Sequence, residues 1–282
     1  MDDDRRSRIL GPLTARPGPG RATLIAVLST VVFVGLLVAL VTQAPGWPEF
    51  KAYFFDWQKY REAFPEIASA FVINIKIFCI SEVIILVTAL VLAVLRSLPG
   101  PVFFPVRALA VVYTDFFRGV PTILVILMLG TGMPALGLAG VPTSQIFWAV
   151  VSLVLVYTAY VSEVYRAGIE SVHPSQEAAA RSLGLSRFQA LRFVILPQAV
   201  RRVVPPLLND FIGLQKDTAL VSVLGVVEVL QQSQIDEAAT FNGTYYLVAA
   251  TLFVLITIPL ARFTDWLIAR DRRRRQAAGV PA

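Results

Sequence analysis

The chain has 282 residues, of which 56% are hydrophobic and only 16% are charged. Soluble domains carry about a quarter charged residues, so the composition favours an integral membrane protein. The net charge of +6 does not indicate nucleic-acid binding, because the basic residues flank apolar segments, as membrane orientation requires. A single cysteine, Cys79, and a single histidine, His173, exclude a disulfide framework within one chain and a multi-histidine metal centre.

Six apolar segments predict six transmembrane helices, since about 20 apolar residues cross the hydrocarbon core. In chain order they are residues 24–42, about 67–95, about 106–129, 146 to about 165, a polar-interrupted span from about 203, and about 245–268. No small-residue cleavage site follows the first segment, which favours a retained anchor over a signal peptide.

Lysine and arginine lie mainly in both tails and in alternate connections between the spans. They are dense in residues 1–23, in the connection between the fourth and fifth spans, and in the basic tail 271–282, whereas 43–66 mixes them with acids. The positive-inside rule therefore predicts that both termini are cytoplasmic and that the linker 43–66 is extracytoplasmic.

The cytoplasmic connection, about 172–200, has the signals of a short helix, a turn and a second helix. Ser175 and Ser186 are predicted to cap the helices, Gly184 to end the first and Pro197 to close the second. The second helix places apolar residues on one face, namely Phe188, Leu191 and Ile195. Two interpretations remain open on physical grounds: a linker lying on anionic lipid, or a docking element for a cytoplasmic partner.

This stretch resembles the EAA loop of permease subunits of ATP-binding-cassette (ABC) importers, whose pattern is Glu-Ala-Ala, three residues, Gly, nine residues, Ile, one residue, Leu-Pro. The matching residues are Ala179, Ala180, Gly184, Leu196 and Pro197, with Val194 in place of isoleucine. Glu177 lies one residue before the pattern's glutamate position, which Ala178 occupies, so its side chain is rotated by about 100° on a helix.

Two further stretches resemble segments of polar amino-acid permeases. One contains Phe117, Arg118, Gly119 and Pro121, with Val120 in place of threonine. The other contains Lys216, Asp217, Thr218 and Leu220, with Ala219 in place of serine. The three motifs occur in order at compatible spacing, and the resemblance covers roughly residues 71–270.

The resemblance implies an all-α membrane protein of about six transmembrane helices: a five-span importer core, residues 67–270, after an extra N-terminal helix, with cytoplasmic coupling helices. It implies a cell-membrane location and four kinds of partner: a second permease, identical or similar; two ABC ATPases on the EAA loops; an extracytoplasmic binding protein that delivers a polar amino acid; and the lipid bilayer. The sequence has no Gly-x-x-x-x-Gly-Lys-Ser/Thr loop, so we expect neither enzyme activity nor a cofactor of its own, with ATP held by the partner ATPase.

Ionisable residues within the spans should face protein or water, because lipid exposure is costly. The candidate pathway or interface residues are Lys76, Asp115, Arg118, Lys216, Asp217 and Thr218. Asp115 and Arg118, at i and i+3, are predicted to pair or to contact substrate. Lys76 suits a carboxylate of either the substrate or a neighbouring helix. Glu163 and Arg166 are predicted to form a bridge, and His173 to be a plain loop residue.

Three other functions fit less of the sequence. A secondary transporter driven by an ion gradient would use the buried charges, but the halves show no inverted repeat. An intramembrane hydrolase would need His173, which the topology places outside the bilayer. A structural scaffold leaves the three motifs unexplained.

Overall fold

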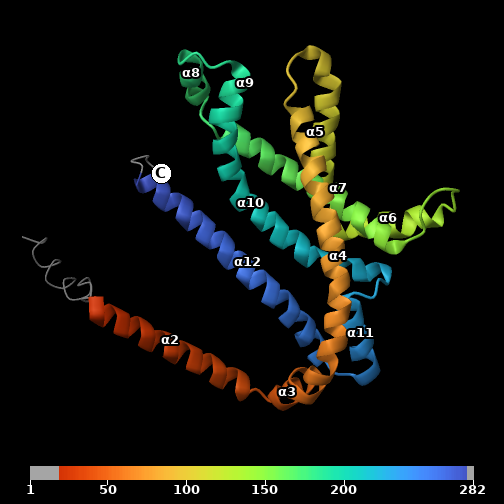
Figure 1. The fold of residues 1–282 in the computed structure, drawn as a ribbon. Coiled ribbons are helices and arrows are strands. Elements are labelled where there is room, and N and C mark those ends of the chain that lie inside the picture. Colours follow the sequence, from red (N-terminus) through yellow and green to blue (C-terminus); the bar gives the residue numbers. More distant parts are fainter. Residues whose placement is uncertain (1–18, 278–282) are drawn as a thin grey trace, which may run out of the picture. The chain divides into compact units, whose positions relative to one another are not determined.

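A computed structural model describes residues 19–277, and all its regular elements are helices (Figure 1). The expectations for residues 1–18 and 278–282 lie outside the described residues. The chain divides into two compact units, residues 1–55 and 56–282. The second unit thus contains the predicted permease core, residues 67–270.

The first unit contains α2 (Pro19–Thr42) and α3 (Trp47–Phe54). The apolar stretch Ala22–Thr42 is long enough to cross a membrane, and no residue of its most apolar window is buried. In α3 the rings of Trp47 and Phe50 stack with centroids 5.8 Å apart. Aromatic side chains of this kind suit the boundary between lipid and water.

The second unit is organised around α4 (Trp57–Arg96), a helix of 40 residues. Asp56 caps its start, because its Oδ1 accepts hydrogen bonds from the backbone N–H groups of Gln58 at 3.0 Å and Lys59 at 3.1 Å. At about 1.5 Å per residue the helix is longer than the hydrocarbon core is thick. The predicted span 67–95 is thus one part of a longer helix, which also includes the aromatic and charged residues before it.

The predicted third span, 106–129, is not one straight helix. After η1 (Pro101–Phe103), α5 (Phe104–Gly119) and α6 (Thr122–Ala135) meet at an angle of 102°. The break falls at Val120, which is extended (φ −95°, ψ 130°), directly before Pro121. Proline disfavours the helical conformation of the preceding residue and lacks the N–H that would continue the helix, so the break follows from the sequence.

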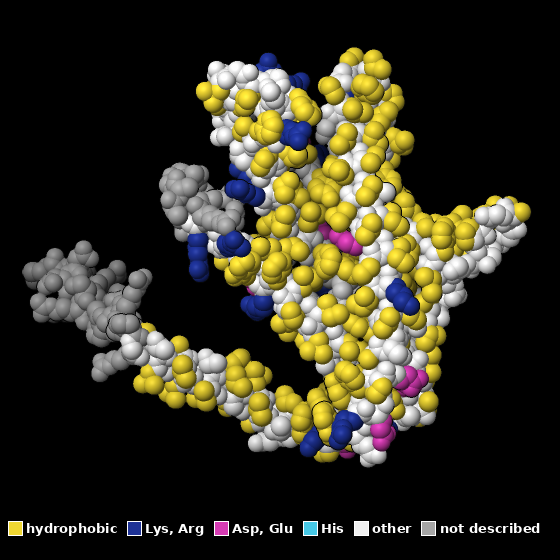
Figure 2. All heavy atoms as spheres, in the orientation of Figure 1, with side chains coloured by type: hydrophobic (Ala, Val, Ile, Leu, Met, Phe, Trp, Pro, Cys, Tyr) yellow, Lys and Arg dark blue, Asp and Glu magenta, His cyan; other side chains and the backbone are white. Residues whose placement is uncertain are grey.

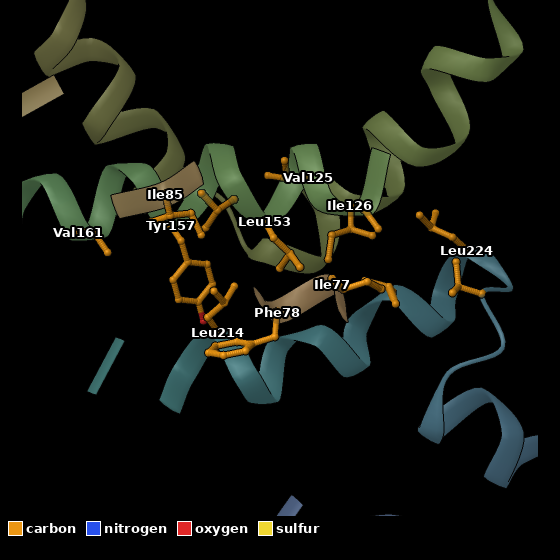
Figure 3. Close-up of a cluster of buried hydrophobic side chains, with 14 of the residues drawn as sticks. Ile77, Phe78, Ile85, Val125, Ile126, Leu153, Tyr157, Val161, Leu214 and Leu224 are labelled. Carbon is orange, nitrogen blue, oxygen red and sulfur yellow. The ribbon is translucent and has the colours of Figure 1, made fainter. Parts of the chain in front are cut away.

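Helix α7 (Gln145–Glu170) passes through the middle of the unit, as predicted for the fourth span. Its buried side chains, among them Leu153 and Tyr157, meet those of α4 and α6 and those of two elements that come later in the chain (Figure 3). These elements are α10 (Leu196–Asp217) and the 3-10 helix η3 (Thr218–Leu224). This cluster fixes the crossing of the central helices.

A second apolar cluster joins α4 to α11 (Val229–Thr240) and α12 (Thr244–Ala277). It contains Ile67, Phe71 and Val248, and Phe71 meets Phe253 edge-to-face at 5.1 Å. Between α7 and α10 lie α8 (Pro174–Ser182), α9 (Arg187–Ala190) and the π-helix η2 (Leu191–Ile195).

Four helical stretches within residues 19–277 are long and apolar enough to cross a membrane, or five if the bent α5–α6 pair is one span. They lie within Ala22–Thr42, Trp47–Arg96, Gln145–Glu170 and Thr244–Arg270. The all-α membrane fold is confirmed, but the count of six is not. Helix α10, predicted as the fifth span, is not among them, because its polar and charged residues lower its mean hydropathy.

Candidate functional site

The segment 172–200 forms the predicted helix–turn–helix, with a different residue at its start. Pro174 is the first residue of α8, and the His173 side chain caps the helix by accepting a hydrogen bond from the Ser175 N–H at 3.2 Å. The prediction that Ser175 is the cap was wrong, because proline prefers the first helical position and moves the cap to the residue before it. His173 therefore has a defined structural role.

Gly184 makes the turn between the two helices with a positive φ of 87°, as predicted for a helix end. The Gly184 N–H bonds to the Arg181 carbonyl at 2.9 Å, and the Leu185 N–H bonds to the Ala180 carbonyl at 3.2 Å. This pair of bonds is the Schellman motif. A β-carbon at Gly184 would meet nothing within 4 Å, so glycine is required here by the backbone conformation and not by crowding.

The second helix begins as predicted but does not end at Pro197. Ser186 and Gln189 form a reciprocal capping box, with bonds of 3.2 and 2.8 Å. The chain then passes through the π-helical turn of η2, where the Leu196 N–H bonds to the Leu191 carbonyl, and continues into α10. Pro197 sits in the first turn of α10. Because the wider π-helical turn comes before Pro197, the proline lies at the start of α10 and not inside an α-helix. The segment is therefore continuous with this core helix.

The surface of this segment is apolar and basic. Leu183 is 85% exposed and Phe188 is 68% exposed, and Phe193, Leu191 and Leu196 are also exposed. Exposed arginines accompany them, namely Arg181, Arg187 and Arg192. Figure 2 shows yellow and dark-blue side chains together over α8 and α9. We name these eight residues the coupling surface. An exposed apolar patch beside charged groups is typical of a protein-docking surface.

The residues at the Glu-Ala-Ala part of the EAA pattern differ in exposure. Ala178 and Ala179 are exposed, whereas Ala180 is buried under the turn. Glu177 is half-buried, and its Oε1 lies 3.6 Å from Nε of Arg187 across the turn. Hence the carboxylate that lies one residue early contacts the chain's own second helix.

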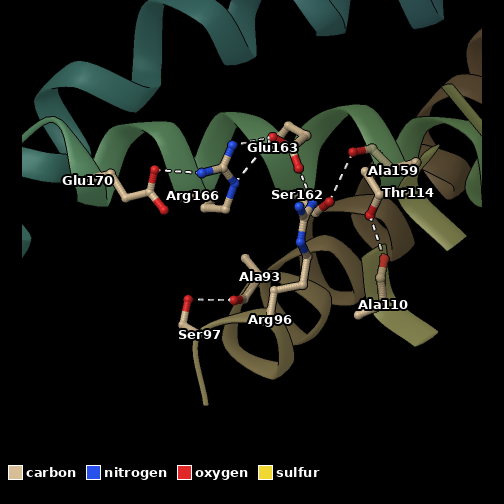
Figure 4. A network of polar contacts seen from close by, with 10 residues as sticks. All are labelled: Ala93, Arg96, Ser97, Ala110, Thr114, Ala159, Ser162, Glu163, Arg166 and Glu170. Carbon is tan, nitrogen blue, oxygen red and sulfur yellow. Dashed lines mark hydrogen bonds and ion pairs between the residues drawn. The ribbon is translucent and has the colours of Figure 1, made fainter. Parts of the chain in front are cut away.

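A charged network connects the base of the segment to α4 (Figure 4). Glu163 bonds to Arg96 through one oxygen and to Nη2 of Arg166 at 2.7 Å through the other. Arg166 also bonds to Glu170 at 2.5 Å. The predicted Glu163–Arg166 bridge is confirmed, and Arg96 is a partner that the sequence did not predict. Because Glu163 and Arg96 are mostly buried, the network ties the ends of α4 and α7 together.

The predicted ion pair of Asp115 with Arg118 is absent, although both residues are described and exposed. The Arg118 guanidinium lies over the Tyr160 ring, 5.8 Å from its centroid. An aromatic face attracts a cation, and this contact takes Arg118 towards α7 and away from its own helix.

The side chains of residues 216–218 have different surroundings. Asp217 Oδ2 accepts a hydrogen bond from the Tyr157 hydroxyl at 2.9 Å, and Thr218 Oγ1 accepts one from Asn74 Nδ2 at 3.2 Å. Lys216 is exposed. Lys76 is also exposed on α4, so these two cations are not covered by their own chain.

The structure adds a buried carboxylate that sequence analysis missed. Glu228 is 0% exposed and accepts a hydrogen bond from Asn74 Nδ2 at 2.7 Å. Its other oxygen caps α11 by accepting bonds from the N–H groups of Leu230 at 3.0 Å and Gln231 at 2.9 Å. Asn74 Oδ1 in turn accepts the Val229 N–H at 3.1 Å. An acid directly before a helical stretch was the available signal.

An open cleft of about 470 Å³ lies between α7 and α10. Its lining includes the charged residues Arg118, Glu163, Arg202 and Asp210. Oδ2 of Asp210 is buried and has no hydrogen-bond partner among the described residues. Charges of both signs thus face one largely apolar cleft beside the segment 172–200.

Comparison with known proteins agrees with this arrangement. Residues 87–273 match the profile of the family described as binding-protein-dependent transport system inner membrane component. A probable amino-acid permease protein of Bacillus subtilis, YxeN, is 34% identical over 72% of this chain and 90% of its own length. The glutamate/aspartate import permease protein GltK of Escherichia coli is 32% identical over 77% of this chain and 99% of its own.

Solved structures show the same fold. A chain of an amino acid ABC transporter crystallised with histidines is 28% identical, with a TM-score of 0.69, and the match covers 76% of this chain and 98% of that one. A chain of the inward-facing methionine transporter MetNI shares the fold at a TM-score of 0.59 and 16% identity, over 72% of this chain and 95% of that one. Helices α2 and α3 precede the residues that match the family profile.

Proposed function

Because the chain belongs to the family of binding-protein-dependent transport system inner membrane components, we propose that it carries a polar amino acid through the membrane, driven by a partner ATPase. The coupling surface carries this proposal. It presents Leu183 and Phe188 to a partner from a segment that is continuous with the core helix α10. A force applied to the surface would therefore reach the membrane helices directly.

We place the coupling surface in the cytoplasm. Arginine is dense in residues 166–202 and in both tails, and this asymmetry favours cytoplasmic termini. The ends of α4 and α7 at the Arg96–Glu163–Arg166 network lie on the same side of the unit as α8 and α9 (Figure 1). An ATPase in that compartment would seat the exposed Leu183 and Phe188 in an apolar cleft.

We propose that two permease chains, identical or similar, enclose the pathway. Lys76 and Lys216 are exposed on helices of the core, and contact of a lysine with the hydrocarbon of the membrane would be unfavourable. A second permease would cover them. Helix α2 lies outside the matched residues and adds an anchor to the common core.

The cleft between α7 and α10 supports an amino acid as the substrate. A free amino acid carries an ammonium and a carboxylate, and the cleft offers Asp210 for the first and Arg118 or Arg202 for the second. The relatives' names include permeases for arginine and for glutamate/aspartate, so the α-amino and α-carboxylate groups are the chemistry these substrates share.

Uptake by reconstituted complexes tests the proposal. We expect radiolabelled amino acid to enter liposomes only when the permease, an ATPase subunit, ATP and a loaded binding protein are all present. Uptake driven by a sodium or proton gradient without ATP would instead support a secondary transporter and would refute the proposal.

A further inference from the structure

The turn between α11 and α12 holds an aromatic residue in an unusual conformation. Phe241 has φ 50° and ψ 45°, and among residues 19–277 it is the only non-glycine residue with a positive φ. It is also 83% exposed. Glycine suits a left-handed helix end far better, and Gly243 stands only two residues later. A strained backbone that displays a large apolar ring to solvent is a feature of functional surfaces.

The turn is held firmly. The Phe241 N–H bonds to the Glu237 carbonyl at 2.7 Å, and Asn242 Oδ1 accepts the Thr244 N–H at 3.0 Å. Asn242 and Thr244 are buried, and Thr244 Oγ1 accepts the Asp56 N–H at 3.1 Å. The ring is thus presented on an ordered support, which lowers the entropic cost of binding a partner.

The same end of the unit carries a hollow. The Asp56–Thr244 bond joins the first turn of α4 to the start of α12, at the end of the unit away from α8 and α9 in Figure 1. There a hollow of about 430 Å³ is lined by Trp57, Gln58, Arg61 and Glu62. The exposed ring and the hollow thus lie at the same end of the unit.

The charge around the ring selects the kind of partner. Residues 231–243 contain Asp236 and Glu237 but no lysine, arginine or histidine. Asp236 and Glu66 share the side-chain amide of Gln232, each at 3.0 Å, so a further acid stands close by. Arg61 at the hollow is offset by Glu62 beside it, so the acids predominate. An anionic lipid headgroup would be repelled here, whereas a protein with a basic rim would be attracted.

We propose that Phe241 anchors the extracytoplasmic binding protein, inserting its ring into an apolar pocket bordered by lysines and arginines. This inference rests on the proposed function, which supplies the partner and the side of the membrane. Buried aromatic residues at the centre of an interface commonly dominate the binding free energy. The residue is accordingly an interaction residue, with no part in the chemistry of transport.

The test measures ATPase stimulation in purified complexes in nanodiscs, titrated with loaded binding protein. Phe241→Ala should raise the half-saturating concentration about tenfold with an unchanged maximal rate, as expected for a binding anchor. Phe241→Gly relieves the strained backbone but also removes the ring, so it should weaken binding equally while raising the thermal midpoint. Phe241→Trp should retain binding. Leu183→Ala, at the coupling surface, should lower the maximal rate without changing half-saturation.

The outcomes are separable. If the wild-type complex is stimulated and Phe241→Ala leaves half-saturation unchanged, the anchor is refuted alone. If Phe241→Ala leaves half-saturation unchanged but separates permease copies by size, the occupant is a second permease and the proposal is equally refuted. A wild-type complex that no binding protein stimulates refutes the proposed function itself.

Discussion

Glu177 and Arg187 face each other across the turn at Gly184, with Oε1 of the glutamate 3.6 Å from Nε of the arginine. The contact links α8 to α9 on the exposed side of the turn. Both side chains are more than a third exposed, so the pair contributes about 0–1 kcal/mol. The conformation of the turn therefore depends mainly on Gly184 and its two backbone hydrogen bonds.

Gly184→Asp should remove ATPase stimulation and transport together while the protein still inserts into the membrane. Asp and Asn tolerate the left-handed conformation better than other non-glycine residues, so the main change in Gly184→Asp is a carboxylate added to a docking surface. Gly184→Asn has nearly the same shape without the charge and should therefore retain most of the activity. Arg187→Ala should have little effect. Near-normal coupling by Gly184→Asp would identify the segment as a lipid-bound linker.

Leu183→Ala combined with Phe188→Ala should weaken the ATPase–permease complex by at least about tenfold. These are the most exposed apolar side chains of the coupling surface, and the few residues that dominate an interface each contribute more than about 1 kcal/mol. The measurement is the dissociation constant of the ATPase subunit from permease in nanodiscs. Leu136→Ala is the matched control, since it removes an exposed leucine outside the coupling surface. An unchanged dissociation constant in the double variant would contradict the assignment of the surface.

The local features of the segment were predictable from sequence, and the tertiary ones were not. Glycine at a left-handed helix end and serine as a cap act within a few residues, so Gly184 and Ser186 were identified correctly. Val120–Pro121 also gave a local signal of a break, but the continuous apolar run around it favoured a single span. Pro197 was misassigned because a π-helical turn, which no sequence pattern announces, lets the helix continue.

Contacts between distant residues account for the remaining errors. The Asp115–Arg118 pair was plausible on one helix, yet the Tyr160 ring, distant in sequence, holds the arginine. Likewise Asn74 and Glu228 are separated by 154 positions. Neither residue reveals its partner through spacing, because the pairing depends on how α4 and α11 pack.

Cysteine labelling should determine the topology. With Cys79 replaced, a cysteine at Leu183 should react with an impermeant reagent only from the cytoplasmic side, and one at Gln58 only from outside, as the arginine distribution predicts. Both positions are exposed, whereas Ala190 is 0% exposed and would be a poor site. Labelling of the cysteine at position 183 from outside intact cells would contradict the predicted orientation.

Glu163→Gln should lower the thermal midpoint of the purified permease by several degrees and reduce coupling. The substitution leaves Arg96 and Arg166 without their shared charge in a mostly buried network, and hydrogen bonds to charged groups contribute about 1.5–3 kcal/mol each. Glu170→Gln removes the exposed end of the same network and should change the midpoint little. Equal effects of the two substitutions would show that the network does not tie α4 to α7.

Exchange of the amide and carboxylate groups between the two positions tests the buried contact between Asn74 and Glu228. In Glu228→Gln the new amide can face the Asn74 amide as donor to donor, and in Asn74→Asp two carboxylates meet in a buried site. Each single change should lower the free energy of unfolding by about 1–3 kcal/mol, because a buried polar group loses its partner.

The double variant Asn74→Asp/Glu228→Gln restores one donor facing one acceptor. The carboxylate introduced on α4 would still accept the Val229 N–H, and the amide introduced before α11 would still cap that helix through its carbonyl oxygen. We therefore expect the double variant to recover part of the lost stability, with a favourable coupling energy in the double-mutant cycle. Thermal unfolding of the four proteins in one detergent gives the cycle. Additive losses would mean that the bond does not hold α11 against α4 and that α11 is positioned by its apolar contacts alone.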